Sequence, residues 1–425
     1  MTIAEAGPDT QRVLIEIGRR GVMTAPEIQA LLGKSQPTVA RLLRGLSAQV
    51  LALGTGRSTR YAAPAPIGGR SAQQPVWWIQ ADGTVQRWGT LSFLVGQRVY
   101  VQAPGVDALA SGRLPWFLEP LRAQGFLGRV LAQRLASGPD ANPDRWSIEQ
   151  VLFAALHLHD APGALVLGEA PPAPAAPVSD YDALADDVAA TLPAGSSAGG
   201  EQAKFLARAG DGRHVLVKFS PPRDTPFGER WHDLLHAESL ALAVLREHGT
   251  PVAESRVVET ARRTFLESTR FDRIGATGRR HVVTLDAIHD AFVPGPRQHW
   301  AATCEALVRQ RRAAPELARQ ALALLHFGRL IGNTDMHFGN LSFFVEPRDV
   351  VRGHFRLAPL YDMLPMRWRP DTASGALDLQ PCEPDARALQ SPARSLASEF
   401  WQRLADHAPV SRGFRRLAAA MARLT

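Results

Sequence analysis

Ile331-Gly332-Asn333-Thr334-Asp335-Met336-His337-Phe338-Gly339-Asn340 is the segment on which the interpretation of the whole chain depends. Before it, residues 317–327 place apolar side chains at helical spacing, which predicts a helix. After it, residues 341–345 predict a short buried strand. An Asp, a His and an Asn therefore occupy a helix-to-strand connection that contains no Lys or Arg. This composition favours a catalytic loop over a structural turn.

The spacing Asp335-x-x-x-x-Asn340 is that of the catalytic loop of protein kinases. In that chemistry a carboxylate orients and deprotonates a hydroxyl, and an amide oxygen holds a divalent cation. A second carboxylate must hold the metal, and Asp362 is placed for it after a predicted strand at residues 354–357. His337 lies within the same loop and is assigned to catalysis with Asp335. Asp and Asn are also common turn formers, so either residue alone would indicate little.

A glycine- and serine-rich segment at residues 195–206 is a candidate phosphate-binding loop, because small residues let backbone N–H groups surround an anion. It lacks the Walker A signature, and a flexible linker would have a similar composition. Two predicted strands follow, joined by Asp211-Gly212, and Lys218 ends the second, where kinases place their phosphate-binding lysine. Glu238, in a predicted helix at 234–248, is the expected partner of Lys218, although it could equally be a solvated helix position.

A predicted strand at residues 264–273 leads towards a hinge, and an adenine ring would lie near Thr269 and Phe271. The alternative for Arg270–Arg273 is an ion-paired turn on the surface.

The first sixty residues predict three short helices and a hairpin. Thr24 and Glu27 form a capping box, Gly33 ends the second helix and Ser35 begins the third. This pattern resembles bacterial winged-helix regulators, in which the third helix enters the major groove of DNA. The predicted DNA-contacting residues are Gln36, Thr38, Arg41 and Arg44 on the helix and Arg57 and Arg60 on the wing. A small helical dimerisation module is the alternative.

Composition sets wider limits. A chain of 425 residues is long enough for two or three domains, and a net charge of +7 weakly favours a polyanionic partner. The only cysteines are Cys304 and Cys382, so neither a disulfide framework nor a cysteine-based metal site is expected. No apolar run reaches the roughly 18 residues of a membrane span, and no secretory signal is evident, so a cytoplasmic protein is expected. Residues 62–66 predict a linker, and residues 76–101 a small antiparallel sheet.

Taken in order, these motifs resemble the HipA family of Ser/Thr kinase toxins from bacterial toxin–antitoxin systems, over roughly residues 75–425. The residues that carry the resemblance are Ser197-x-Gly199-Gly200-x-Gln202-x-Lys204, Lys218, Arg270-Phe271-Asp272-Arg273, Gly332-Asn333-Thr334-Asp335-x-His337-x-x-Asn340 and Leu360-Tyr361-Asp362. A kinase of this type with its own N-terminal helix-turn-helix resembles the YjjJ branch. Two departures from the family pattern are Ala203, where a Glu often precedes the Lys, and Thr269, at a hinge position that is often acidic.

The resemblance implies an α+β fold. A winged helix-turn-helix (1–65) would precede a subdomain with a small sheet (70–185), a nucleotide-binding lobe (186–275) and a mostly helical catalytic lobe (276–425). Asp335 would be the catalytic base, and Asn340 and Asp362 would hold Mg²⁺. Lys218 and Glu238 would hold ATP with the loop from Ser197 to Lys204. Ser197 resembles the serine that such kinases autophosphorylate.

The implied substrate is a protein, such as an aminoacyl-tRNA synthetase or another translation factor. Residues 1–65 would bind the protein's own promoter, and a palindromic operator would imply a homodimer. Two alternatives remain open at this point: a small-molecule phosphotransferase, and a nucleotide-sensing transcription regulator without kinase activity.

Overall fold

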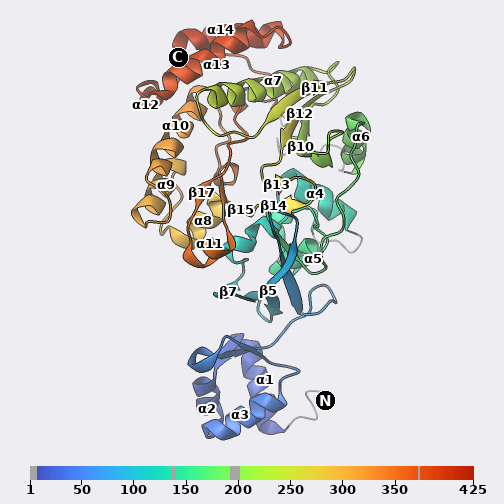
Figure 1. The fold of residues 1–425 in the computed structure, drawn as a ribbon, viewed down its shortest axis with the longest axis vertical. Coiled ribbons are helices and arrows are strands. Elements are labelled where there is room, and N and C mark those ends of the chain that lie inside the picture. Colours follow the sequence, from blue (N-terminus) through green and yellow to red (C-terminus); the bar gives the residue numbers. More distant parts are fainter. Residues whose placement is uncertain (1–6, 136–139, 192–201, 372–373) are drawn as a thin grey trace.

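The computed structural model describes residues 7–135, 140–191, 202–371 and 374–425. It is a mixed α/β molecule with an elongated outline. In Figure 1 the N-terminal helices form one end, and the last two helices form the opposite end.

The N-terminal module packs three helices against a small sheet of order β1-β3-β2. Its elements are α1 (Pro8–Arg20), β1 (Val22–Thr24), α2 (Ala25–Leu32), α3 (Gln36–Gly45), β2 (Leu51–Leu53), the 3-10 turn η2 (Gly56–Ser58) and β3 (Arg60–Ala62). The predicted capping box at the start of α2 is confirmed, since the Thr24 N–H donates to Glu27 Oε2 at 2.6 Å. Gly33 ends α2 in the left-handed conformation, with φ +64°.

The predicted linker at residues 62–66 is wrong. Ala65 N–H donates to Phe93 O and Val95 N–H donates to Ala63 O, each at 3.0 Å, so the segment pairs with the neighbouring sheet. Ala62 is buried with Leu53, Leu94 and Tyr100 in a small apolar cluster. Proline is tolerated at a sheet edge because it lacks only the N–H, and a Pro/Ala composition therefore does not exclude pairing.

The middle of the chain forms a five-stranded antiparallel sheet of order β7-β6-β5-β4-β8, which confirms and extends the predicted sheet. Its strands are β4 (Gln73–Ile79), β5 (Val85–Leu94), β6 (Arg98–Ala103), β7 (Val106–Ser111) and β8 (Leu165–Leu167). The accompanying helical segments are η3 (Trp116–Leu121), α4 (Gly125–Arg134), η4 (Pro143–Arg145) and α5 (Ile148–Ala155).

A second antiparallel sheet has the order β11-β12-β10-β9. Its strands are β9 (Lys204–Arg208), β10 (His214–Phe219), β11 (Ser255–Glu259) and β12 (Thr264–Thr269). The predicted pairing around Asp211-Gly212 is confirmed, and Lys218 lies between Lys204 and Leu266 on the neighbouring strands. The long helix α7 (Pro226–Glu247) contacts β11 and β12 (Figure 1), while apolar residues of α4 and α6 (Tyr181–Thr191) share a core with the sheet.

The C-terminal part is mostly helical around a three-stranded sheet of order β15-β16-β17. Its elements are β13 (Arg273–Ile274), β14 (Gly278–Arg279), β15 (Val282–Thr284), α8 (Leu285–Phe292), α9 (Trp300–Arg309), α10 (Glu316–Leu330), η6 (Phe338–Asn340), β16 (Ser342–Phe344), α11 (Pro347–Arg352), β17 (Arg356–Leu357), η7 (Met366–Trp368), α12 (Ala386–Leu389), α13 (Ala393–Asp406) and α14 (Arg412–Leu424). One apolar core runs from the five-stranded sheet through α7 to these helices. Among the described residues, no helix is long and apolar enough to cross a membrane.

Candidate active site

Three charged side chains from distant parts of the chain meet in one cluster. Lys218 Nζ, at the end of β10, lies 2.7 Å from both carboxylate oxygens of Glu238 on α7. The same ammonium donates to Asp362 Oδ1, which follows β17. The predicted Lys218–Glu238 pair is therefore confirmed, and the pairing of Lys218 with Asp362 shows that residues 218 and 362 face a shared space.

The cluster contains two carboxylates, those of Glu238 and Asp362, and the single ammonium of Lys218 contacts both. Burial disfavours the Lys218 ammonium, but Asp362 and Glu238 outweigh burial and raise its pKa. Burial also opposes ionisation of Asp362, yet Lys218 and Lys204 lower its pKa to about 2. Burial and the nearby Asp362 raise the pKa of Glu238 against the attraction of Lys218. Two carboxylates thus share one ammonium, and Asp362 keeps 25% of its side chain exposed to solvent.

The loop at residues 331–340 is fastened to this cluster by amide side chains. Asn333 is buried and donates from Nδ2 to the Asp362 carbonyl at 3.3 Å, while its Oδ1 accepts from the Asp335 N–H at 3.0 Å. Asn340 is also buried, and its Nδ2 donates to the Asp335 carbonyl at 2.8 Å. These bonds bring Asp335, Asn340 and Asp362 into one locality and leave the Asn340 Oδ1 as an acceptor.

The backbone around the loop is specialised. Gly332 has φ +72°, and a Cβ there would lie 2.5 Å from the Trp368 ring, so a larger residue is excluded. Asp362 itself has φ +59°, a left-handed conformation that Asp tolerates better than most residues but at some cost. The Tyr361 hydroxyl donates to the Gly339 carbonyl at 2.8 Å and so joins both segments.

His337 is exposed and caps the start of the 3-10 turn η6. Its Nδ1 accepts from the Gly339 N–H at 3.0 Å, and its carbonyl accepts from the Trp300 indole N–H at 3.0 Å. These contacts show a part in shaping the loop, and its catalytic assignment stays a prediction.

The predicted nucleotide loop is only partly described. Ser197, Gly199 and Gly200 lie outside the described residues. Gln202 is buried, and its Nε2 has no hydrogen-bond partner among the described residues. Lys204 begins β9 beside Lys218 and acts on the charge of Asp362.

At the predicted hinge, several polar groups are already bonded within the protein. The Thr269 N–H donates to the Glu254 carbonyl at 2.7 Å, and the Arg270 N–H donates to the His214 carbonyl at 2.9 Å. The Thr269 hydroxyl also accepts from Arg213 at 2.6 Å. These donors are thus paired within the protein, and the assignment of Thr269 and Phe271 to the hinge stays a prediction.

The alternative for Arg270–Arg273, an ion-paired turn on the surface, is confirmed in its ion pairs but wrong about the surface, because Arg270 and Asp272 are buried. Asp272 accepts from Arg270 at 3.0 Å and from Arg273 at 2.7 Å. Asp160, after α5, pairs with both arginines, at 2.8 Å and 2.6 Å. Sequence reasoning missed Asp160, because it lies far away in the chain and no short-range spacing pattern includes it.

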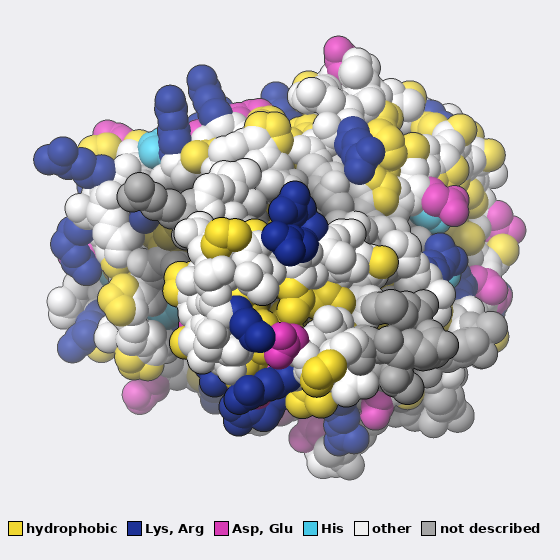
Figure 2. Space-filling view, turned by 90° about the horizontal axis from the view of Figure 1, so that it is seen from below, with side chains coloured by type: hydrophobic (Ala, Val, Ile, Leu, Met, Phe, Trp, Pro, Cys, Tyr) yellow, Lys and Arg dark blue, Asp and Glu magenta, His cyan; other side chains and the backbone are white. Residues whose placement is uncertain are grey.

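On the N-terminal module, four predicted DNA-contacting residues are exposed on α3, at one end of the molecule (Figure 1): Gln36, Thr38, Arg41 and Arg44. Figure 2, which views that end, shows Lys and Arg side chains spread over the face. Arg60 differs, because its guanidinium pairs with Asp107 of β7 at 3.1 Å and so belongs to the joint with the middle sheet. The side chain of Arg57 is not described.

Comparison with known proteins decides the family. Residues 196–424 match the HipA-like C-terminal domain, and residues 70–174 match the middle domain of YjjJ-like toxins. The chain is also 35% identical to the Toxin YjjJ of Escherichia coli (strain K12) over 434 residues, which covers 96% of each chain. The chain belongs to the HipA-like toxin family. The resemblance expected from its motifs is thus confirmed, including the YjjJ branch.

A solved structure of this family has the same fold. HipA of Shewanella oneidensis MR-1, in a complex with HipB and its operator DNA, superposes with a TM-score of 0.56 at 16% identity, covering 83% of this chain and 95% of that one. At this identity the likeness establishes the fold of the HipA-like part and leaves the roles of individual residues to the local geometry.

Proposed function

We propose that this HipA-like chain is an ATP- and Mg²⁺-dependent serine/threonine protein kinase of the toxin–antitoxin type. The observation that carries the proposal is the convergence of Lys218, Glu238 and Asp362, with the Asp335–Asn340 loop bonded to the same place. Phosphoryl transfer depends almost entirely on positioning and charge neutralisation, and these are the two things that such a cluster supplies.

The donor set fits magnesium. Asp362 offers a partly exposed carboxylate and Asn340 offers an amide oxygen, and Mg²⁺ prefers hard oxygen ligands. When bound, the ion would neutralise phosphate charge. Asp335 would accept a hydrogen bond from the substrate hydroxyl and take its proton as transfer proceeds. Asn333 would hold Asp335 and Asp362 at a constant separation, because it bonds to the backbone of both.

Lys218 would act as the phosphate ligand by exchanging one partner. Its contact with Glu238 would keep the ammonium in place, while its contact with Asp362 would give way to a phosphate oxygen. Ser197, Gly199, Gly200, Gln202 and Lys204 would line the phosphates, and Thr269 and Phe271 the base. The Gln202 Nε2, which has no acceptor within the part of the chain that the structure describes, supports this assignment, because a buried donor normally has one. Ser197 would be the autophosphorylated residue.

Transfer of label from γ-labelled ATP, with Mg²⁺, tests the proposal. Intact protein should label protein, whereas Asp335→Ala and Asp362→Ala should each lose at least about 10²-fold of the rate. Asp290→Asn is a suitable control, because Asp290 is exposed on α8 and pairs with Arg297 at 2.7 Å. Label appearing only on small molecules would indicate a small-molecule phosphotransferase. Nucleotide binding without transfer would indicate a nucleotide-sensing regulator. Either outcome would overturn the proposal that the chain is a protein kinase.

The N-terminal module would bind DNA. Support comes from two helices joined by the Gly33 turn and from an exposed polar face on α3. Residues 1–65 would then repress the protein's own promoter, with a homodimer on a palindromic site. The protein substrate would belong to translation, with an aminoacyl-tRNA synthetase as the first to test, and the setting would be the cytoplasm.

A further inference from the structure

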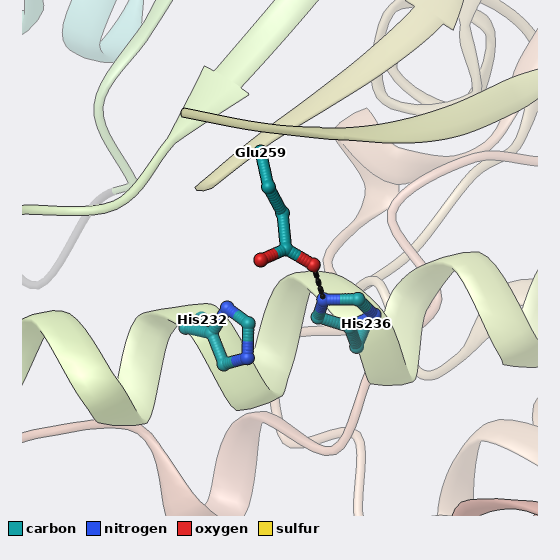
Figure 3. A group of neighbouring side chains, drawn as sticks. All are labelled: His232, His236 and Glu259. Carbon is teal, nitrogen blue, oxygen red and sulfur yellow. Dashed lines mark ion pairs between the residues drawn. The ribbon is translucent and has the colours of Figure 1, made fainter. Parts of the chain in front are cut away.

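A second group of polar side chains lies on the opposite face of the helix that carries Glu238. His232 and His236 are one turn apart on α7, and Glu259 ends β11 above them. Figure 3 shows both imidazoles on the same side of the helix, with the carboxylate facing them. One ligand atom from each of the three residues lies within 4.8 Å of the other two. Histidines at i and i+4 on a helix are the spacing that metal sites use.

The hydrogen bonds of His232 fix which nitrogen carries the proton. Its Nε2 lies 2.9 Å from the Pro409 carbonyl, which can only accept, so Nε2 holds the hydrogen. Nδ1 is therefore left with a lone pair, and it lies 2.6 Å from the Thr264 hydroxyl. A backbone carbonyl on the far nitrogen is the arrangement that orients metal-binding histidines. Thr264 is fully buried, so a metal ion at Nδ1 would require its side chain to rotate about χ1 and move the oxygen away from the lone pair.

His236 has a buried nitrogen whose hydrogen-bonding capacity is not met. Its Nδ1 pairs with His407 Nε2 at 3.0 Å, which again occupies the nitrogen farther from Glu259. Its Nε2 lies 3.3 Å from Glu259 Oε1 but without the alignment of a hydrogen bond, and it has no hydrogen-bond partner among the described residues.

We propose that His232 Nδ1, His236 Nε2 and Glu259 bind a divalent transition-metal ion of the zinc type. Two imidazoles and one carboxylate form a common zinc ligand set, with a water as fourth ligand. Mg²⁺ fits poorly, because it prefers oxygen ligands alone. Arg223 pairs with Glu259 Oε2 at 2.5 Å and limits the carboxylate's affinity, but Oε1 is the oxygen that faces His236.

A bound ion would hold α7 in place against the elements that surround it. The three ligands join the helix to the edge of the β9–β12 sheet, while His407 and Pro409 connect the same histidines to the segment between α13 and α14. Glu238 lies on α7 only two residues beyond His236, so the ion would restrain the helix that positions the partner of Lys218. The inference goes beyond the proposed kinase activity, and metal binding can be measured without any phosphoryl transfer.

Zinc uptake by the full-length protein tests the proposal directly. Metal-free protein dialysed against ZnCl₂ should retain about one zinc per chain by elemental analysis, and its Tm should rise by about 5 °C. MgCl₂ should produce neither effect. His236→Gln and Glu259→Gln should each weaken zinc binding by at least about tenfold.

His248→Gln is the matched control, because His248 caps the same helix, is exposed and pairs with Glu399 at 2.8 Å. It should retain zinc as the unchanged protein does. The Tm of each variant without zinc reports whether it folds. If His236→Gln fails to fold, Glu259→Gln decides, since Glu259 lies at a half-exposed strand end. The proposal is overturned if the unchanged protein retains no zinc, or if both ligand variants retain it with unchanged affinity; the three side chains would then form only a hydrogen-bonded cluster.

Discussion

The Lys218 cluster and the α3 surface carry their polar residues in opposite ways. Lys218 and Glu238 are buried and form an ion pair. Asp362 beside them adopts the left-handed backbone conformation, with φ +59°. Arg41 and Arg44 are exposed on α3, and few contacts within the protein hold them. In the first region the protein has already incurred the cost of desolvating charge, whereas in the second that cost would arise only when a partner binds. A buried cluster should therefore respond to substitution through stability as well as function, and an exposed surface through binding alone.

Lysine substitutions give the sharpest contrast. Lys218→Met leaves Glu238 and Asp362 without their shared cation, and we expect a loss of about 4 kcal/mol in the free energy of unfolding. Lys34→Met is the control, because Lys34 is exposed and lies 3.6 Å from the exposed Asp9, which predicts a change below about 0.5 kcal/mol. Urea unfolding followed by circular dichroism measures both. Equal midpoints for the two variants would show that burial of the cluster has no energetic meaning.

The Arg270–Arg273 turn extends the comparison to a second buried network. Asp272→Asn removes the charge that two buried guanidiniums share, and we expect a loss of about 3 kcal/mol. Asp186→Asn is the matched control, since Asp186 also pairs with two arginines but is itself half-exposed. Its change should be clearly smaller than that of Asp272→Asn, because solvent screens ion pairs at the surface. Asp272→Asn should therefore unfold at a lower urea concentration than Asp186→Asn. The reverse order would contradict the conclusion that the buried Asp272 network stabilises the fold.

His281, a buried residue next to β15 that bonds to η3, should make the free energy of unfolding depend on pH. His281 donates from Nε2 to the Phe117 carbonyl at 2.9 Å, and burial lowers its pKa from 6.5 to about 4. Between those values the unfolded chain binds more protons than the folded one, so stability falls as pH falls through this window. From pH 7 to pH 5 the contribution is about 2 kcal/mol. In His281→Gln that part of the slope should disappear. An identical slope in the variant would mean that His281 titrates normally in the fold.

The smallest change in free energy is expected for a substitution on the exposed α3 surface. Arg41→Ala should weaken binding to the protein's own promoter by about 1 kcal/mol and reduce the salt slope by about one ion. Its stability should be unchanged. Arg19→Ala is the control, because Arg19 pairs with Glu16 on α1 and lies off α3. Fluorescence anisotropy over a range of salt concentrations measures both. Equal affinities would contradict the assignment of α3 as the DNA-contacting helix.

Short-range patterns predicted the elements that position the site. The capping box of Thr24 and Glu27, the hairpin around Asp211-Gly212 and the helix carrying Glu238 each depend on residues close in sequence, so propensity and spacing were sufficient. The loop at 331–340 could be interpreted because its residue types have few structural uses together. Asn333 was part of that motif, but spacing alone gave no reason to assign it a positioning role.

Contacts between distant segments could not be predicted in this way. Asp160 meets Arg270 and Arg273 only because the fold brings the middle domain against the β9–β12 sheet. Arg60 was expected on a free wing, and the structure pairs it with Asp107 on another sheet. The alanines and prolines at residues 62–66 have the composition of a linker, and only the neighbouring edge of β5 shows that they pair.

That paired segment has a mechanical consequence. Ala63 and Ala65 are bonded to β5, Tyr100 accepts from the Gly54 N–H at 2.8 Å, and Arg98 donates to the Arg20 carbonyl at 3.0 Å. A module fastened at three points cannot swivel like a tethered one, so residues 7–62 behave as a lever attached to the middle sheet. Torque applied to α3 would pass into β5 and β6, and two such chains held on one scaffold would keep their Lys218 clusters at a set distance and angle.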